Sequence, residues 1–200
     1  MAGIRAAEPD ESVVTDVLFV CTANLCRSPM AAEILRHRLR ERGASVTIAS
    51  AGVLEPDRPA VEGAQRALAG RGLDASGHRS RRLDADMVRG AGLVLGLERQ
   101  HVREVVVLDP AAWSRAFTLK EIVRRSEAVG PREAAEPWPR WLDQVHFGRQ
   151  RADLLGSSPD DDVADPTGGA LEDYETTADE LDDLVSRLVN LGWPPEPDAR

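Results

Sequence analysis

Cys21 and Arg27 stand six positions apart, and Cys21 directly follows four apolar residues at positions 17–20. Across a short loop, this spacing lets an arginine guanidinium face a cysteine sulfur over a pocket lined by backbone N–H groups. Such a pocket fits a phosphoryl group, because N–H donors and a guanidinium both bind oxyanions. The loop at positions 21–28 is therefore interpreted as a catalytic phosphate-binding loop.

A helix is expected to start directly after this loop, because Pro29 suits a first helical turn and the following residues have helical periodicity. The positive end of that helix would favour a bound oxyanion and an ionised thiol. Ser28 adds a hydroxyl that can hydrogen-bond the sulfur. Cys21 is thus expected to be a thiolate nucleophile, and the alternative is a buried structural cysteine that closes a strand.

Length and charge narrow the class of protein. A chain of 200 residues fits one domain, and a net charge of −9 argues against nucleic acid or an anionic membrane as partner. The chain shows no signal peptide and no apolar run long enough to span a bilayer, and its two cysteines lie in one loop. These features predict a cytoplasmic protein.

Strand-like and helix-like segments alternate along the first 120 residues, which predicts an α/β fold with a parallel sheet and right-handed crossovers. Ligands bind such sheets at the carboxyl ends of the strands, and Cys21 stands at one of these ends. The expected strands are residues 16–21, 45–50, 92–97 and 115–119, and the expected helices are residues 29–42, 58–71, 83–89 and 98–108.

The pattern breaks after residue 122 and resumes as a long amphipathic helix at 171–191. Residues 141–155 are expected to be helical within an inserted excursion at about 126–162. The domain is expected to span residues 15–193, between a mobile lead-in at 1–14 and a C-terminal tail at 194–200.

Thiolate attack on a phosphate ester needs a carboxylic acid that protonates the leaving group. Asp165 is the best candidate, because Pro166 and the glycines that follow can hold it in a loop over the sheet edge. Asp109, which also precedes a proline, and the acidic run 160–162 are alternatives, although the run is typical of a solvated turn.

The chain resembles the low molecular weight protein tyrosine phosphatase family. The resemblance rests on the Cys-x5-Arg-Ser loop near the N-terminus, a strand that ends Ser50-Ala51-Gly52, and an Asp-Pro pair before the last helix. For the fold, we expect a single doubly wound parallel sheet of four strands in the order 2-1-3-4, with helices on both faces.

The resemblance also implies roles for site residues. Cys21 would be the nucleophile, Arg27 would bind the phosphoryl oxygens, and Asp165 would act as general acid and then as general base. Asn24 would hold the loop in a left-handed turn, with Ser50 and His78 bonded around it. The whole phosphate-binding loop would consist of Thr22, Ala23, Asn24, Leu25, Cys26, Arg27 and Ser28.

Four positions are informative within the family: two bear on regulation and substrate, and two depart from the usual pattern. A second loop cysteine such as Cys26 can form a reversible disulfide with the nucleophile, which predicts redox-regulated activity. Leu25 stands where protein arginine phosphatases, the bacterial branch that this chain otherwise resembles, carry threonine, and a branched apolar residue there goes with phosphotyrosine. Ala23 replaces the usual glycine, and Thr167 replaces an aromatic residue that normally contacts the substrate ring.

The sequence therefore predicts a phosphatase that hydrolyses a phosphorylated protein residue, expected to be phosphotyrosine, through a phosphocysteine intermediate. A protein arginine phosphatase, an arsenate reductase and a non-catalytic phosphate-binding module are the alternatives. No metal or other cofactor is expected, the partner is a phosphorylated protein or peptide rather than nucleic acid or membrane, and a monomer is the expected state.

Overall fold

A computed structural model describes residues 15–54 and 56–195, and it has one parallel sheet of four strands in the order β2-β1-β3-β4. This order and the α/β class confirm the sequence prediction. The central pairing runs along β1, where Phe19 lies opposite Ser50 of β2 and Leu95 of β3. The strands are β1 (Thr15–Cys21), β2 (Ile48–Gly52), β3 (Ala91–Gly96) and β4 (Ala116–Thr118).

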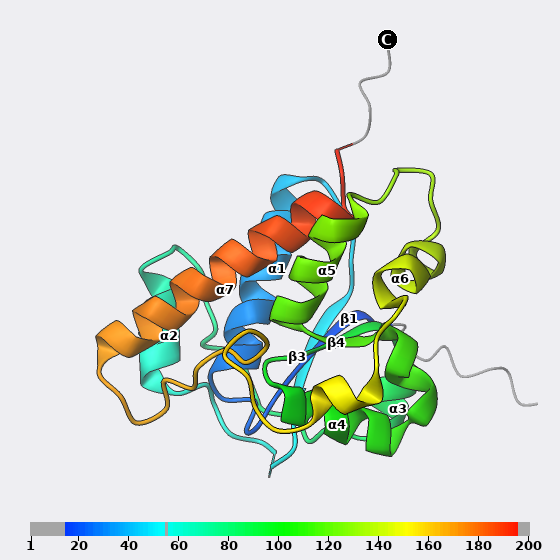
Figure 1. Cartoon of the computed structure of the whole chain (residues 1–200). Helices are drawn as coiled ribbons and strands as arrows, with labels where there is room; N and C mark the ends of the chain where they lie inside the picture. The colour runs from blue at the N-terminus through cyan, green and yellow to red at the C-terminus, as the bar shows by residue number, and fades with distance from the viewer. Residues whose placement is uncertain (1–14, 55, 196–200) are drawn as a thin grey trace, which may run out of the picture.

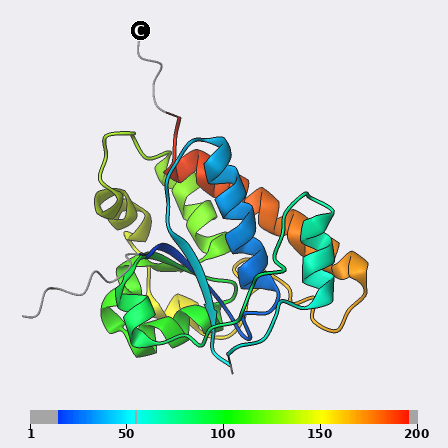
Figure 2. The same ribbon diagram turned by 180° about the vertical axis from the view of Figure 1, so that it is seen from behind.

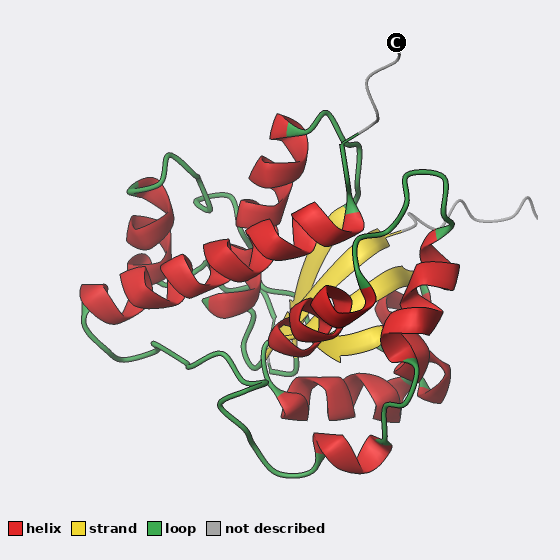
Figure 3. Cartoon of the chain, turned by 45° about the horizontal axis from the view of Figure 1, so that its top comes forward, coloured by secondary structure: helices red, strands yellow, loops and turns green. Residues whose placement is uncertain are grey.

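Helices cover both faces of the sheet, as Figures 1 and 2 show from opposite sides. One face carries α1 (Arg27–Glu41), α2 (Glu62–Ala69), α5 (Leu119–Val129) and α7 (Leu171–Gly192), and the other carries α3 (Ala85–Arg89) and α4 (Arg99–Leu108). Figure 3 shows the sheet enclosed between these helices.

Alternation along β1 divides the core into two clusters. Val17 and Phe19 pack against the helices of the first face, whereas Leu18 and Val20 pack against α3 and α4. A strand buried on both faces is apolar throughout, which is the pattern of parallel sheets. The last residue of this strand, Cys21, reaches the carboxyl edge of the sheet.

The longest helices agree closely with the sequence prediction. In α1 the predicted apolar positions Met30, Ile34, Leu35 and Leu39 are all buried. The last helix, α7, packs along α1 and α5 and spans nearly the predicted range.

Two boundaries were predicted wrongly. The second strand starts at Ile48, later than the predicted 45–50, and includes Ala51 and Gly52, because these residues pair with Val20 and Cys21. The second helix is shorter than the predicted 58–71, since residues 58–61 form an extended segment that precedes α2.

The prediction that regular structure breaks after residue 122 was also wrong, because α5 continues to Val129. Its start has a readable signal: the Thr118 hydroxyl accepts the N–H of Glu121, and the Glu121 carboxylate accepts the N–H of Thr118. The helix predicted at 141–155 is instead α6 (Trp138–His146) followed by the 3-10 helix η2 (Arg151–Leu154).

Residues 110–115 form a further 3-10 helix, η1 (Pro110–Arg115), before β4. The lead-in expected at residues 1–14 and residues 196–200 of the expected tail lie outside the described residues. In the described ranges, none of the helices is long and apolar enough to cross a membrane.

Candidate active site

The loop that follows β1 holds the Cys21 sulfur at the carboxyl edge of the sheet. The backbone N–H of Asn24 donates to Sγ over 3.2 Å, and the Ser28 hydroxyl oxygen lies 2.9 Å from the same atom. Cys21 is 3% exposed, and α1 begins at Arg27, so the amino end of a 15-residue helix adjoins the loop. A helix start of this kind favours negative charge.

Asn24 fixes the shape of the loop. Its φ of 55° lies in the left-handed region, which asparagine tolerates better than most residues. Its side-chain amide donates to the hydroxyls of Ser28 and Ser50, each over 2.9 Å. The Asn24 side-chain oxygen accepts the N–H of Arg81 at 2.9 Å, and its carbonyl oxygen lies 2.7 Å from Nε2 of His78. The structure thus brings Ser50 and His78 to the loop, as predicted from the sequence.

The end of β2 packs directly against this loop at Gly52. A Cβ at this position would lie 2.6 Å from the Asn24 nitrogen and 2.7 Å from the Ala23 carbonyl carbon. Both atoms belong to the backbone, so only glycine fits. Ala23 does not adopt a positive φ, and the loop therefore accommodates alanine without left-handed strain.

Arg27 is buried and is held by contacts from three segments. Its Nη1 donates to the carboxylate of Glu98 and, over 2.9 Å, to the carbonyl oxygen of Val163. Its Nη2 donates to Oδ2 of Asp165 at 2.7 Å and faces the Thr22 hydroxyl at 3.5 Å. Glu98 and Val163 therefore hold the guanidinium at Nη1, while Nη2 faces Thr22 of the loop and Asp165.

Asp165 is oriented by its own loop. Its Oδ1 accepts both the backbone N–H of Thr167, at 3.1 Å, and the Thr167 hydroxyl, at 2.8 Å. Its side chain is 42% exposed, so one face of the carboxylate is open to solvent and to a substrate. Thr167, at the place of the expected aromatic residue, thus orients the acid rather than providing a ring surface.

The alternative acids have other roles. Asp109 follows the carboxyl end of α4 and pairs with Arg115 at 3.2 Å, away from Cys21 and Arg27. The acidic run 160–162 was interpreted as a solvated turn, which is wrong for Asp161: this carboxylate is buried between Arg99 and Arg124. Of these carboxylates, only Asp165 contacts Arg27.

Sequence reasoning missed Glu98 and His101. Both follow β3 at the same sheet edge as Cys21, so the rule that ligands bind at the carboxyl ends of parallel strands could have identified them. His101 is 1% exposed, and its Nε2 lies 3.0 Å from the Thr22 hydroxyl oxygen. Its other ring nitrogen, Nδ1, is buried without a hydrogen-bond partner.

Burial, and then the charge of Arg27, lower the pKa of His101 from its ordinary 6.5 to about 3. The His101 imidazole therefore becomes protonated near pH 6.5 in the unfolded chain, but only near pH 3 in the folded chain. The free energy of unfolding falls as the pH drops through this window. Between pH 7.5 and pH 5, this effect should lower the free energy of unfolding of the wild type by about 2 kcal/mol. The substitution His101→Gln should abolish this loss.

Urea unfolding of the wild type and His101→Gln at both pH values measures the difference. His37→Gln is the matched control, because His37 is 42% exposed on α1. If the free energy of unfolding falls equally from pH 7.5 to pH 5 in the wild type and in His101→Gln, the buried imidazole is not held neutral.

The second loop cysteine has a different environment from the first. Cys26 is 4% exposed, and burial, with smaller contributions from Asp165 and Cys21, raises the pKa of its thiol to about 12. The Cys26 thiol is thus neutral at physiological pH. Both cysteines are free thiols in the structure.

Leu25, the fourth residue of the loop after Cys21, is 7% exposed. Its carbonyl oxygen accepts the N–H of Val61 at 2.9 Å, which ties the loop to the start of α2. An apolar side chain therefore occupies the position where the resemblance places the residue that selects the substrate.

Comparison with known proteins gives consistent results. The model of the family described as low molecular weight phosphotyrosine protein phosphatase matches residues 16–146. The chain is 32% identical to a protein-arginine-phosphatase of Geobacillus stearothermophilus over 174 residues, which are 86% of this chain and 93% of the relative. It is 36% identical to a probable low molecular weight protein-tyrosine-phosphatase of Ralstonia nicotianae over 136 residues, 68% of this chain and 92% of the relative.

Among solved structures, a low molecular weight protein tyrosine phosphatase from T. tengcongensis superposes with a TM-score of 0.67 and 33% identity. The match covers 88% of this chain and 98% of that one. The similarity therefore extends beyond the residues that the family model matches.

Proposed function

Because this chain belongs to the low molecular weight phosphotyrosine protein phosphatase family, we propose that the phosphoryl group it removes from a protein or peptide is carried by tyrosine. The enzyme is a phosphoric monoester hydrolase. The observation that supports the proposed mechanism best is the meeting of Cys21, Arg27 and Asp165 at one edge of the sheet.

In the first step, the Cys21 thiolate attacks phosphorus, so that a P–S bond forms while the P–O bond to the tyrosine oxygen breaks. Asp165 in its acid form gives a proton to the departing oxygen. The N–H groups of the loop and Arg27 bind the phosphoryl oxygens, and Ser28 donates a hydrogen bond to the sulfur. Arg27 suits this role because Glu98 and Val163 already hold its guanidinium in place.

In the second step, the Asp165 carboxylate takes a proton from water as the water oxygen attacks the phosphocysteine. The P–S bond breaks, inorganic phosphate leaves and the Cys21 thiolate is restored. Asp165 is placed for both steps because it stands beside Arg27 and its side chain remains 42% exposed, so that it can reach the leaving oxygen and then a water molecule.

Leu25 supports tyrosine as the substrate residue. An apolar side chain in the phosphate-binding loop can contact an aromatic ring, whereas it offers no hydrogen bond to a guanidinium. A protein arginine phosphatase is the second candidate, because the similarity to the Geobacillus stearothermophilus enzyme extends over 86% of the chain.

The substitution Leu25→Thr should shift the preference toward phosphoarginine. We expect the ratio of kcat/KM for phosphoarginine to kcat/KM for phosphotyrosine to rise about tenfold or more, the usual size of one lost apolar contact and one gained polar contact. The measurement is side-by-side hydrolysis of phosphotyrosine and phosphoarginine by both proteins. Arsenate is offered separately with a low-molecular-weight thiol as the reductant, and arsenite formation is its readout.

Wild-type preference for phosphoarginine would favour the second candidate. Reduction of arsenate with no release of phosphate from either amino acid would contradict both. An unchanged ratio in Leu25→Thr would show that position 25 does not select the substrate.

Cys26 is proposed to protect the nucleophile from irreversible oxidation. Peroxide would convert Cys21 to a sulfenic acid, and the Cys26 sulfur would then form a disulfide with it and release water. Since the Cys26 thiol has a pKa of about 12, its attack should accelerate as the pH rises.

After peroxide treatment, the wild type should therefore recover activity with dithiothreitol, whereas Cys26→Ser should remain inactive. The recovered fraction should increase when the peroxide step is run at higher pH. Equal irreversible loss in the two proteins would contradict the protective role.

A further inference from the structure

Asp165 lies in a segment without regular secondary structure, between η2 and α7. A general acid must be held within hydrogen-bond reach of the leaving oxygen, and an irregular loop provides little rigidity of its own. Thr167 and Arg27 orient the Asp165 carboxylate, but the position of the partly exposed residue also depends on how the backbone of its loop is anchored.

Asp161 supplies such an anchor. Asp161 is only 6% exposed, whereas the neighbouring Asp160 is exposed. Its Oδ2 accepts from Nε of Arg99 at 2.7 Å, and its Oδ1 accepts from Nη2 of Arg124 at 2.8 Å. One loop carboxylate thus joins α4 to α5.

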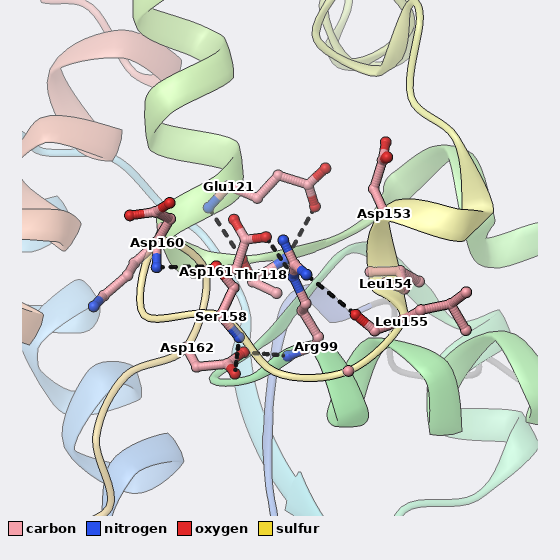
Figure 4. Close-up of polar contacts among 12 residues, drawn as sticks. Arg99, Thr118, Glu121, Asp153, Leu154, Leu155, Ser158, Asp160, Asp161 and Asp162 are labelled. Atoms are coloured by element: carbon pink, nitrogen blue, oxygen red, sulfur yellow. Dashed lines mark hydrogen bonds and ion pairs between the residues drawn. The ribbon is translucent and has the colours of Figure 1, made fainter.

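Asp162 adds one contact to α4 and one within its own loop. Its Oδ1 accepts the backbone N–H of Arg99 at 2.7 Å, and its Oδ2 accepts the N–H of Ser158 at 2.8 Å. Figure 4 shows Asp161, Asp162 and Ser158 gathered at Arg99. We call the group of Asp161, Asp162, Arg99 and Arg124 the acid-loop clamp.

The acid-loop clamp is continuous with the groups that hold Arg27. Arg99 directly follows Glu98, which pairs with Arg27, and Asp161 lies two residues before Val163. The N–H of Val163 donates to the carbonyl oxygen of Leu97 at 2.8 Å, and its own carbonyl oxygen accepts from Arg27. Segments 97–99 and 161–163 therefore lie side by side and lead directly into the site.

The charge of Asp161 is maintained at working pH. Burial raises the pKa of its carboxyl, but hydrogen bonds from Arg124 and Arg99 outweigh burial and hold the pKa below its usual range. A buried carboxylate with two guanidinium partners is strongly coupled to them, and removing its charge weakens both contacts.

We propose that Asp161 is a positioning residue for the general acid, which holds the 161–165 segment so that Asp165 reaches the oxygen of the leaving group. This inference rests on the proposed function, because it assigns proton donation to Asp165. Asp161 itself touches neither substrate nor the reacting atoms.

The substitution Asp161→Asn tests this role through leaving groups of different basicity. Phenolate is a poor leaving group that needs protonation, whereas p-nitrophenolate leaves with little help from an acid. We expect kcat/KM for phenyl phosphate to fall on the order of tenfold more than kcat/KM for p-nitrophenyl phosphate. In an Asp165→Asn background, Asp161→Asn should cause no further loss.

Asp160→Asn is the matched control, because it makes the same charge change one residue away on an exposed side chain. It should leave the ratio of the two rates unchanged. If Asp161→Asn does not fold, Arg124→Gln decides, since the Arg124 side chain is 53% exposed and Arg99 still pairs with Asp161. Arg124→Gln should change the same ratio in the same direction.

Equal losses for both esters, or a full additional loss in the Asp165→Asn background, would overturn the positioning role and indicate a purely structural one. The proposed function fails separately, if the wild type hydrolyses neither ester or if Asp165→Asn leaves the ratio unchanged. The two failures are therefore distinguishable.

Discussion

Serine at position 21 should abolish turnover of p-nitrophenyl phosphate. A neutral hydroxyl is a far weaker nucleophile than a thiolate, and Asp165 is needed in its acid form during the first step, so it does not activate the hydroxyl as a base. The Asn24 N–H donates to this position, and the Ser28 hydroxyl lies within hydrogen-bond distance of it. We expect kcat to fall to the background rate of the assay.

The same variant should retain the binding site, because the loop is held by Asn24 and Gly52 rather than by the sulfur. Cys21→Ser should therefore still bind inorganic phosphate or vanadate, as titration calorimetry would measure. Substantial residual turnover in Cys21→Ser would contradict the assignment of the nucleophile.

Removal of the Asp165 carboxylate should cause the second largest loss. General acid catalysis contributes about 10²- to 10⁴-fold, and the same group is assigned to the second step, so kcat/KM for a poor leaving group should fall by an amount in this range. The loss should be smaller for p-nitrophenyl phosphate, because its leaving group needs less protonation. Steady-state kinetics of Asp165→Ala with phenyl phosphate and p-nitrophenyl phosphate measure both effects.

The pH profile gives an independent check on this assignment. The basic limb of the kcat/KM profile should flatten in Asp165→Ala, because the first step then no longer depends on a protonated donor. Asp160→Ala, an exposed acidic residue in the same loop, is the control for the change in net charge. Near wild-type activity of Asp165→Ala on phenyl phosphate would refute the assigned acid.

Much of the fold follows from local patterns. The apolar run of β1, the stripe along α7 and the alternation of strands with helices each have one simple period, and these elements lie close to where the sequence predicted them. The second strand was displaced because its extent depends on pairing with Val20 and Cys21, which is a tertiary contact. Helix α5 was missed although Thr118 and Glu121 form a capping box at its start.

The site was predicted unevenly, for a physical reason. Cys21 and Arg27 are close in sequence, so their spacing alone suggests a shared pocket. Glu98, His101 and Asp161 act over long sequence separations, and their roles depend on how the strand ends meet. Asp161 was interpreted as solvated because a run of three carboxylates is usually exposed, but Arg99 and Arg124 compensate its burial.

Hydrolysis through a phosphocysteine at Cys21 leaves a covalent intermediate that can be trapped. Rapid acid quenching of Asp165→Ala during turnover of p-nitrophenyl phosphate, followed by peptide mass spectrometry, tests this pathway most directly. One phosphoryl group is expected on the peptide that contains Cys21, and it should accumulate because the second step lacks its base. Phosphate release without any phosphorylated peptide, or a phosphoryl group on a different residue, would contradict this pathway.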